Sequence, residues 1–60
     1  MILLKIAMGK IKEADQLVKQ ACVNTNDETV LEILAEIDYA LVDSLEKLKA
    51  VQEILDIKVQ

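Results

Sequence analysis

The chain has 60 residues, of which 53% are hydrophobic, and 7 basic residues against 11 acidic ones give a net charge of −4. A domain this short buries only about 60% of its unfolded surface, so disulfides, a metal ion or further subunits usually stabilise it. A single cysteine excludes an intrachain disulfide, and the lack of histidine removes the commonest metal ligand. We therefore expect the chain to be stabilised by self-association.

The same composition limits the chemistry. The sequence contains no histidine, no arginine and one glycine, so catalytic nucleophile–base pairs, phosphate-binding loops and arginine clamps lack their parts. We expect no enzymatic activity, no catalytic residues, no cofactor and no metal site. The apolar run Ile2–Met8 is interrupted by Lys5 and is too short for a signal peptide, and no stretch is long enough to span a membrane. The expected location is the cytoplasm, where a lone thiol stays reduced.

The first element is predicted to be a helix from about Ile2 to Val23. Branched residues recur every seven positions, and alanines recur every seven positions three places later. The branched series is Leu4, Ile11 and Val18, the alanine series is Ala7, Ala14 and Ala21, and Met8, Leu17 and Cys22 widen the stripe. A stripe this wide is typical of a helix in a four-helix bundle.

The segment Asn24–Asp27 predicts a turn. Asn24 tolerates the left-handed conformation that often ends a helix, and Thr25 with Glu28 has the spacing of a capping box. Asn26 or Asp27 could serve as the cap instead. A loop of about two to four residues makes the two helices antiparallel neighbours.

The second element is predicted to be one long helix from about Asn26 to Val59, because no Gly or Pro interrupts it. Its apolar seam is expected to consist of Leu34, Leu41, Leu48 and Leu55 at one heptad position and of Val30, Ile37, Ser44 and Val51 at the other. At 1.5 Å per residue this helix is about 50 Å long, against about 32 Å for the first. A hairpin then places Met1 beside roughly residue 49.

The length difference predicts an assembly surface. The end of the second helix has no intrachain partner, and the apolar N-terminus lies beside it, so a second chain is expected to cover both. The predicted oligomer interface consists of Ile2, Leu4, Met8, Leu48, Val51, Ile54, Leu55 and Val59. The fold expected for residues 1–60 is one all-α antiparallel hairpin that assembles into a homodimeric or homotetrameric bundle.

Acidic residues are predicted to line the outer side of the second helix. They are Glu32, Glu36, Asp43, Glu46 and Glu53. Such residues usually form a solvated face, and the alternative is a surface for a basic protein partner. The first helix has a net charge of +2 and the remainder −6, which favours pairing the first helix with the second.

A nucleic-acid regulator is the alternative to a protein-interaction module. If residues 2–8 formed a strand, the order strand–helix–helix would resemble ribbon-helix-helix repressors, although only Lys5 could read a groove and the net charge is negative. The layering of small and large residues resembles the Rop-type RNA-binding dimer, without its basic and aromatic face. The segment Leu34-Ala35-Glu36-Ile37-Asp38 resembles the Ser-x-x-Leu-Asp segment of the aspartyl-phosphate phosphatases of spore formers, with Leu34 in place of the serine. Neither family is assigned.

Overall fold

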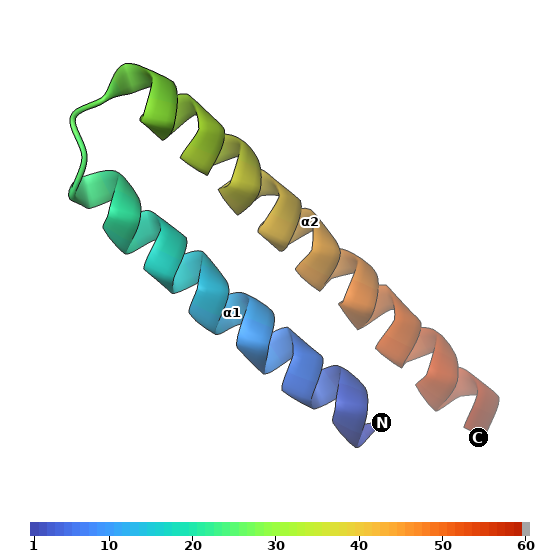
Figure 1. Ribbon diagram of the computed structural model, residues 1–60. Helices are drawn as coiled ribbons and strands as arrows, with labels where there is room; N and C mark the ends of the chain where they lie inside the picture. The colour runs from blue at the N-terminus through green and yellow to red at the C-terminus, as the bar shows by residue number, and fades with distance from the viewer. Residues whose placement is uncertain (60) are drawn as a thin grey trace.

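The computed structural model describes the backbone of residues 1–59 and the side chains of residues 1–58. Helix α1 (Ile2–Val23) and helix α2 (Glu28–Val59) lie antiparallel and pack against each other (Figure 1). This part of the chain contains no strand, so the all-α hairpin is confirmed and a strand over residues 2–8 is wrong. Gly9 does not break α1, and a Cβ at this position would have open space around it.

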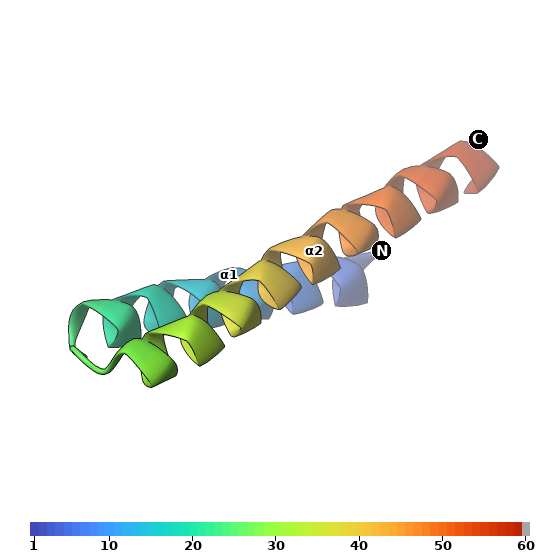
Figure 2. The same ribbon diagram turned by 90° about the horizontal axis from the view of Figure 1, so that it is seen from above.

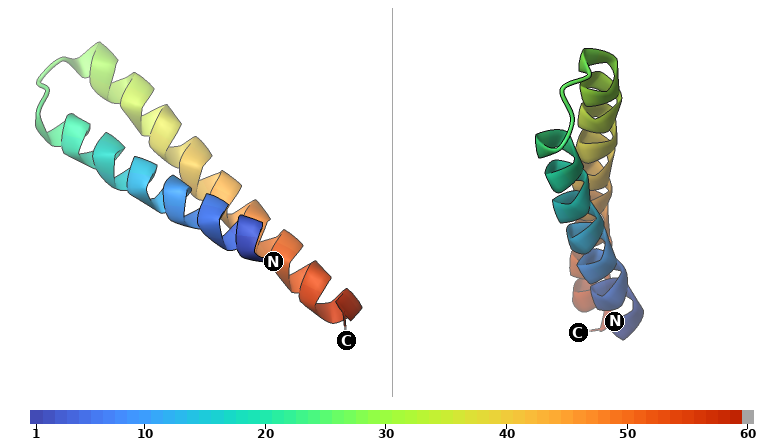
Figure 3. Two further views of the ribbon diagram at one scale, coloured as in Figure 1. Left: turned by 60° about the horizontal axis from the view of Figure 1, so that its bottom comes forward. Right: turned by 60° about the vertical axis from the view of Figure 1, so that its left-hand side comes forward.

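The hairpin is a single layer of two helices that cross at a shallow angle (Figures 2 and 3). Its extents are 50 × 15 × 10 Å. No side chain among the described residues is fully buried, because each helix is covered on one side only. The molecule therefore has a half-buried seam between the helices rather than an enclosed core.

Asp27 begins α2, and the predicted capping box does not form. The Asp27 carboxylate accepts a hydrogen bond of 3.0 Å from the backbone N–H of Val30, as an N-cap residue does. The Thr25 hydroxyl instead accepts a bond of 3.3 Å from the N–H of Asp27, which tightens the turn. Asn24 ends α1 with φ −91°, so it does not use the left-handed conformation that its residue type allows.

The N-terminus fixes the register of the two helices. The amino group of Met1 donates a hydrogen bond of 3.0 Å to the side-chain oxygen of Gln52. Met1 thus lies beside the side chain of Gln52, close to the level of roughly residue 49 that the sequence predicts. The overhang of α2 beyond α1 begins at Glu53 and continues along the last two turns of α2, past the end marked N in Figure 1.

The seam of α2 differs from the prediction at one of its two heptad positions. Leu34, Leu41, Leu48 and Leu55 are half-buried, as expected. The other half-buried positions are Leu31, Asp38, Leu45 and Gln52. The residues predicted there, namely Val30, Ile37, Ser44 and Val51, each precede these by one position and are exposed. A helix turns by about 100° per residue, so the seam of α2 is rotated by part of a turn from the predicted one.

The capping role of Asp27 can be tested by substitution. Asp27→Ala removes the acceptor for the Val30 N–H and is expected to lower the free energy of unfolding by about 1 kcal/mol in urea denaturation. Asn26→Ala, one residue earlier, is the control and should change it by only a few tenths of a kcal/mol. Equal effects from the two variants would contradict the assignment of Asp27 as the cap.

Candidate functional site

Most of the exposed apolar residues of the two helices directly precede a half-buried seam residue in the sequence. In α1 the half-buried Leu4, Ala7 and Val18 are preceded by exposed Leu3, Ile6 and Leu17. Between them the charged residues Lys10 and Glu13 occupy the same kind of position and form an ion pair of 3.9 Å. The exposed positions of α2 that precede a seam residue are Val30, Ile33, Ile37, Ala40, Ser44, Lys47, Val51 and Ile54, and all but Ser44 and Lys47 are apolar. A second apolar stripe therefore runs along α2 about 100° away from the seam, interrupted by Lys47, and the corresponding stripe of α1 is divided by Lys10 and Glu13.

The two second stripes lie on the same side of the hairpin. Both are displaced from their seam in the same rotational sense, viewed along each helix from its N-terminus. Because α1 and α2 run in opposite directions, this common sense places the two stripes on one broad side of the layer. We call this side the apolar face; its large exposed residues are Leu3, Ile6, Leu17, Val30, Ile33, Ile37, Val51 and Ile54.

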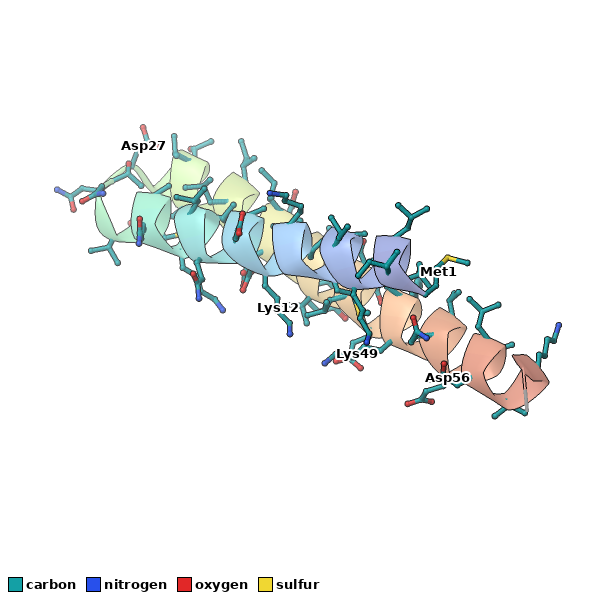
Figure 4. The ribbon with its side chains drawn as sticks, turned by 90° about the horizontal axis from the view of Figure 1, so that it is seen from below. Met1, Lys12, Asp27, Lys49 and Asp56 are labelled. Carbon is teal, nitrogen blue, oxygen red and sulfur yellow. The ribbon has the colours of Figure 1, made fainter. Side chains whose placement is uncertain are left out.

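The opposite broad side is polar. It is formed by the residues that directly follow the seam positions; its charged members include Lys5, Lys12 and Lys19 on α1 and Glu32, Glu46, Glu53 and Asp56 on α2. Exposed Val23, Ala35, Tyr39 and Val42 lie among them. Lys12, Lys49 and Asp56 all project from the lower side of the molecule in Figure 4. An open groove runs along this polar face, lined by Ile11, Lys12, Asp15, Gln16, Lys19, Leu41, Val42 and Leu45. The groove confirms that residues after the seam in both helices share one side.

The structure divides the predicted oligomer interface into two groups. Leu4, Met8 and Leu48 are half-buried in the seam of the hairpin, and Leu55 is half-buried on the overhang. Ile2, Val51 and Ile54 are exposed, the last two on the apolar face. Val59 is the last residue of α2, and its side chain lies outside the described residues. The sequence-based interpretation thus missed the middle of the apolar face, which lies between Leu17 and Ile37.

The predicted acidic residues are all exposed, but they do not form one surface. Glu32, Glu46 and Glu53 belong to the polar face, and Glu36 and Asp43 lie on the outer side of α2 beside the apolar face. Asp43 is engaged by Lys47 in an ion pair of 3.0 Å. On an exposed helix such a pair stabilises by about 0.3–0.5 kcal/mol.

Two aspartates interrupt the apolar seam at one level. The register set by Met1 and Gln52 places Asp15 of α1 level with Asp38 of α2. Lys19 binds one oxygen of Asp15 at 2.8 Å, yet the other Asp15 oxygen and one oxygen of Asp38 are buried without a hydrogen-bond partner. Among the described residues Asp38 forms no ion pair. An unsatisfied buried carboxylate oxygen destabilises the hairpin at this level.

Other candidate chemistry is sparse in the part of the chain that the structure describes. Cys22 is a free, half-buried thiol near the turn. No three His, Cys, Asp or Glu residues come close enough together to hold a metal ion among these residues. Neither helix, over its described length, is apolar enough to cross a membrane.

Comparison with protein-family models, with curated proteins and with solved structures gave no match. The site must therefore be interpreted from the residues themselves. The feature that distinguishes it is the pair of apolar stripes on one side of a hairpin that has no enclosed core.

The polar layer gives a direct prediction. The Asp38 carboxylate has one buried oxygen without a hydrogen-bond partner, and leucine occupies most other seam positions of α2. Asp38→Leu should therefore raise the free energy of unfolding by about 1–3 kcal/mol. Thermal and urea unfolding measure the change. The matched control is Tyr39→Leu at the neighbouring exposed position, which should leave stability within about 0.5 kcal/mol. A destabilised Asp38→Leu variant would mean that a partner occupies this layer.

Proposed function

We propose that the protein is a small, non-enzymatic interaction module that self-associates through the apolar face of its hairpin into a four-helix bundle. The observation that favours this proposal is the position of the second stripes. In a square bundle each helix contacts two neighbours at about 90° to one another, and α2, together with the two ends of α1, has apolar stripes separated by about that angle. The occupant of the apolar face is a second copy of the chain, which presents the same stripes.

The surface area of the hairpin supports this occupant. A compact monomer of 6.7 kDa is expected to expose about 3,900 Å². The hairpin exposes 4866 Å², so the excess is about 1,000 Å². A standard interface buries about 800 Å² on each partner. Covering the apolar face therefore brings the exposed surface to the range of a compact globular protein.

The charged residues suggest how the assembled module is used. When two apolar faces meet, the two polar faces remain on the outside, with their lysines on α1 and their carboxylates on α2. With a net charge of −4 per chain, the outer surface favours basic protein partners and repels polyphosphates. The proposed role is that of an adaptor or regulator that presents this surface in two copies.

Self-association is tested by a matched pair of substitutions on α2. Ile37 and Val42 are almost equally exposed, at 43% and 44%, but lie on the apolar and polar faces respectively. Ile37→Lys puts a charge into the proposed interface and should raise the dimer dissociation constant at least about 30-fold, as expected for loss of about 2 kcal/mol or more. Val42→Lys should change it less than about threefold. Sedimentation across a concentration series measures both variants.

The same measurement can overturn the proposal. The wild-type protein should sediment as an oligomer at micromolar concentration, and its helical content and mass should fall together on dilution. A folded monomer under these conditions, or equal weakening by the two lysine variants, would contradict assembly through the apolar face.

The nucleic-acid alternative is tested by gel shift at low salt. The assembled protein should shift neither duplex DNA nor RNA at about 50 mM salt, because a net negative surface gains nothing from counterion release. Addition of the protein to an oligolysine peptide should, in contrast, give binding that weakens as salt is raised. A nucleic-acid shift with a steep salt dependence would favour a regulator of the RNA- or DNA-binding class.

A further inference from the structure

We infer that the two copies pair through α2, antiparallel, about a twofold axis that passes beside the level of Val42. This inference rests on the proposed self-association and specifies its geometry. Each α2 then contacts α1 of its own chain and α2 of the second copy. Because the axis lies at the level of residue 42, two residues of the paired α2 helices lie at the same level when their numbers add up to about 84.

The length of the α2 stripe favours α2 as its own partner. From Val30 to Ile54 the stripe spans 24 steps, or about 36 Å, whereas the α1 stripe from Leu3 to Ala21 spans about 27 Å. An α1 helix of the second copy would leave Ile54 uncovered. A second α2 in antiparallel orientation covers the whole stripe, because Val30 then meets Ile54 at both ends of the bundle.

This arrangement also covers the overhang. The part of α2 beyond Gln52 lies level with the turn of the second copy, where the register about Val42 brings residues 53–58 beside residues 26–31. Both overhangs are covered at once, because the axis lies close to the midpoint of α2. The bundle then ends flush at both ends.

The side chains nearest to the axis are small. Ala40 of one copy meets Ser44 of the other, twice, so four small residues surround the axis. Small residues let two helix backbones approach closely. The exposed Ser44 hydroxyl also has room to bond to the carbonyl four residues earlier in its own helix.

Charges beside the stripe are complementary in this register. Lys47 interrupts the apolar stripe, and the residue at its level on the second copy is Ile37, with Glu36 beside it on the outer side. Lys47 can therefore bridge Asp43 of its own chain, which lies 3.0 Å away, and Glu36 of the second copy. The twofold axis produces this pairing twice.

Spin labels on the polar face of α2 test the arrangement. In a Cys22→Ala background, Glu32→Cys and Tyr39→Cys place single labels at two exposed positions. Antiparallel pairing separates the two labels along the bundle by about 30 Å at position 32 and by about 9 Å at position 39. Pulsed electron paramagnetic resonance on the assembled protein should find the distance at position 39 much the shorter of the two.

The possible outcomes separate the two proposals. Equal distances at both positions would overturn the antiparallel α2 pairing, because they require both turns to lie at the same end of the bundle, and would leave self-association intact. A monomeric sample with no label–label distance would overturn both. Sedimentation of each labelled variant confirms its mass before the distances are interpreted.

A charge exchange provides an independent readout. Lys47→Glu puts like charges together and should weaken dimerisation about three- to tenfold. Adding Glu36→Lys in the same chain restores opposite charges only if these two positions meet between copies, and should recover the wild-type dissociation constant. If the double variant is weaker than Lys47→Glu alone, the register about Val42 is wrong.

Discussion

The properties of this molecule depend on a limit of two-helix geometry. A hairpin gives each helix one neighbour, so only one side of each helix can be covered within the chain. Helix α2 and the two ends of α1 have two adjacent apolar sides, and the seam uses one of them. The half-buried state of every seam residue and the exposure of the apolar face follow from this single fact, and both favour a bundle as the functional unit.

The seam itself is a compromise between burial and specificity. Leucine occupies most of its positions on α2, and Asp38 and Gln52 occupy the others. Gln52 binds the N-terminus and Asp56, at 3.0 and 2.8 Å, so it fixes the end of the hairpin at the same time as it weakens the apolar contact. Asp15 and Asp38, by contrast, each have one buried carboxylate oxygen that accepts no hydrogen bond. A polar residue within an apolar seam can fix register at the expense of stability, and the end near Gln52 is the clearer instance of this role.

Much of the fold could be predicted from local sequence signals. The absence of Gly and Pro after Thr25 predicted the long uninterrupted α2, and the Asn24–Asp27 segment predicted the tight antiparallel connection. The choice of Asp27 over Thr25 as the cap was left open, because several adjacent residues had suitable side chains and only the backbone path of the turn decides which one reaches the N–H groups.

The sequence by itself determined that both helices are amphipathic over more than one side, that the connection is short, and that the chain has few groups for catalysis. Tertiary structure decided which side faces inward. Ile37 and Asp38 are neighbours, and hydrophobicity alone would turn Ile37 toward α1; in the structure Asp38 faces α1 and Ile37 is exposed. One step along a helix rotates the side chain by about 100°, so a choice between adjacent apolar sides depends on how the whole of α2 packs on α1 and not on any single residue.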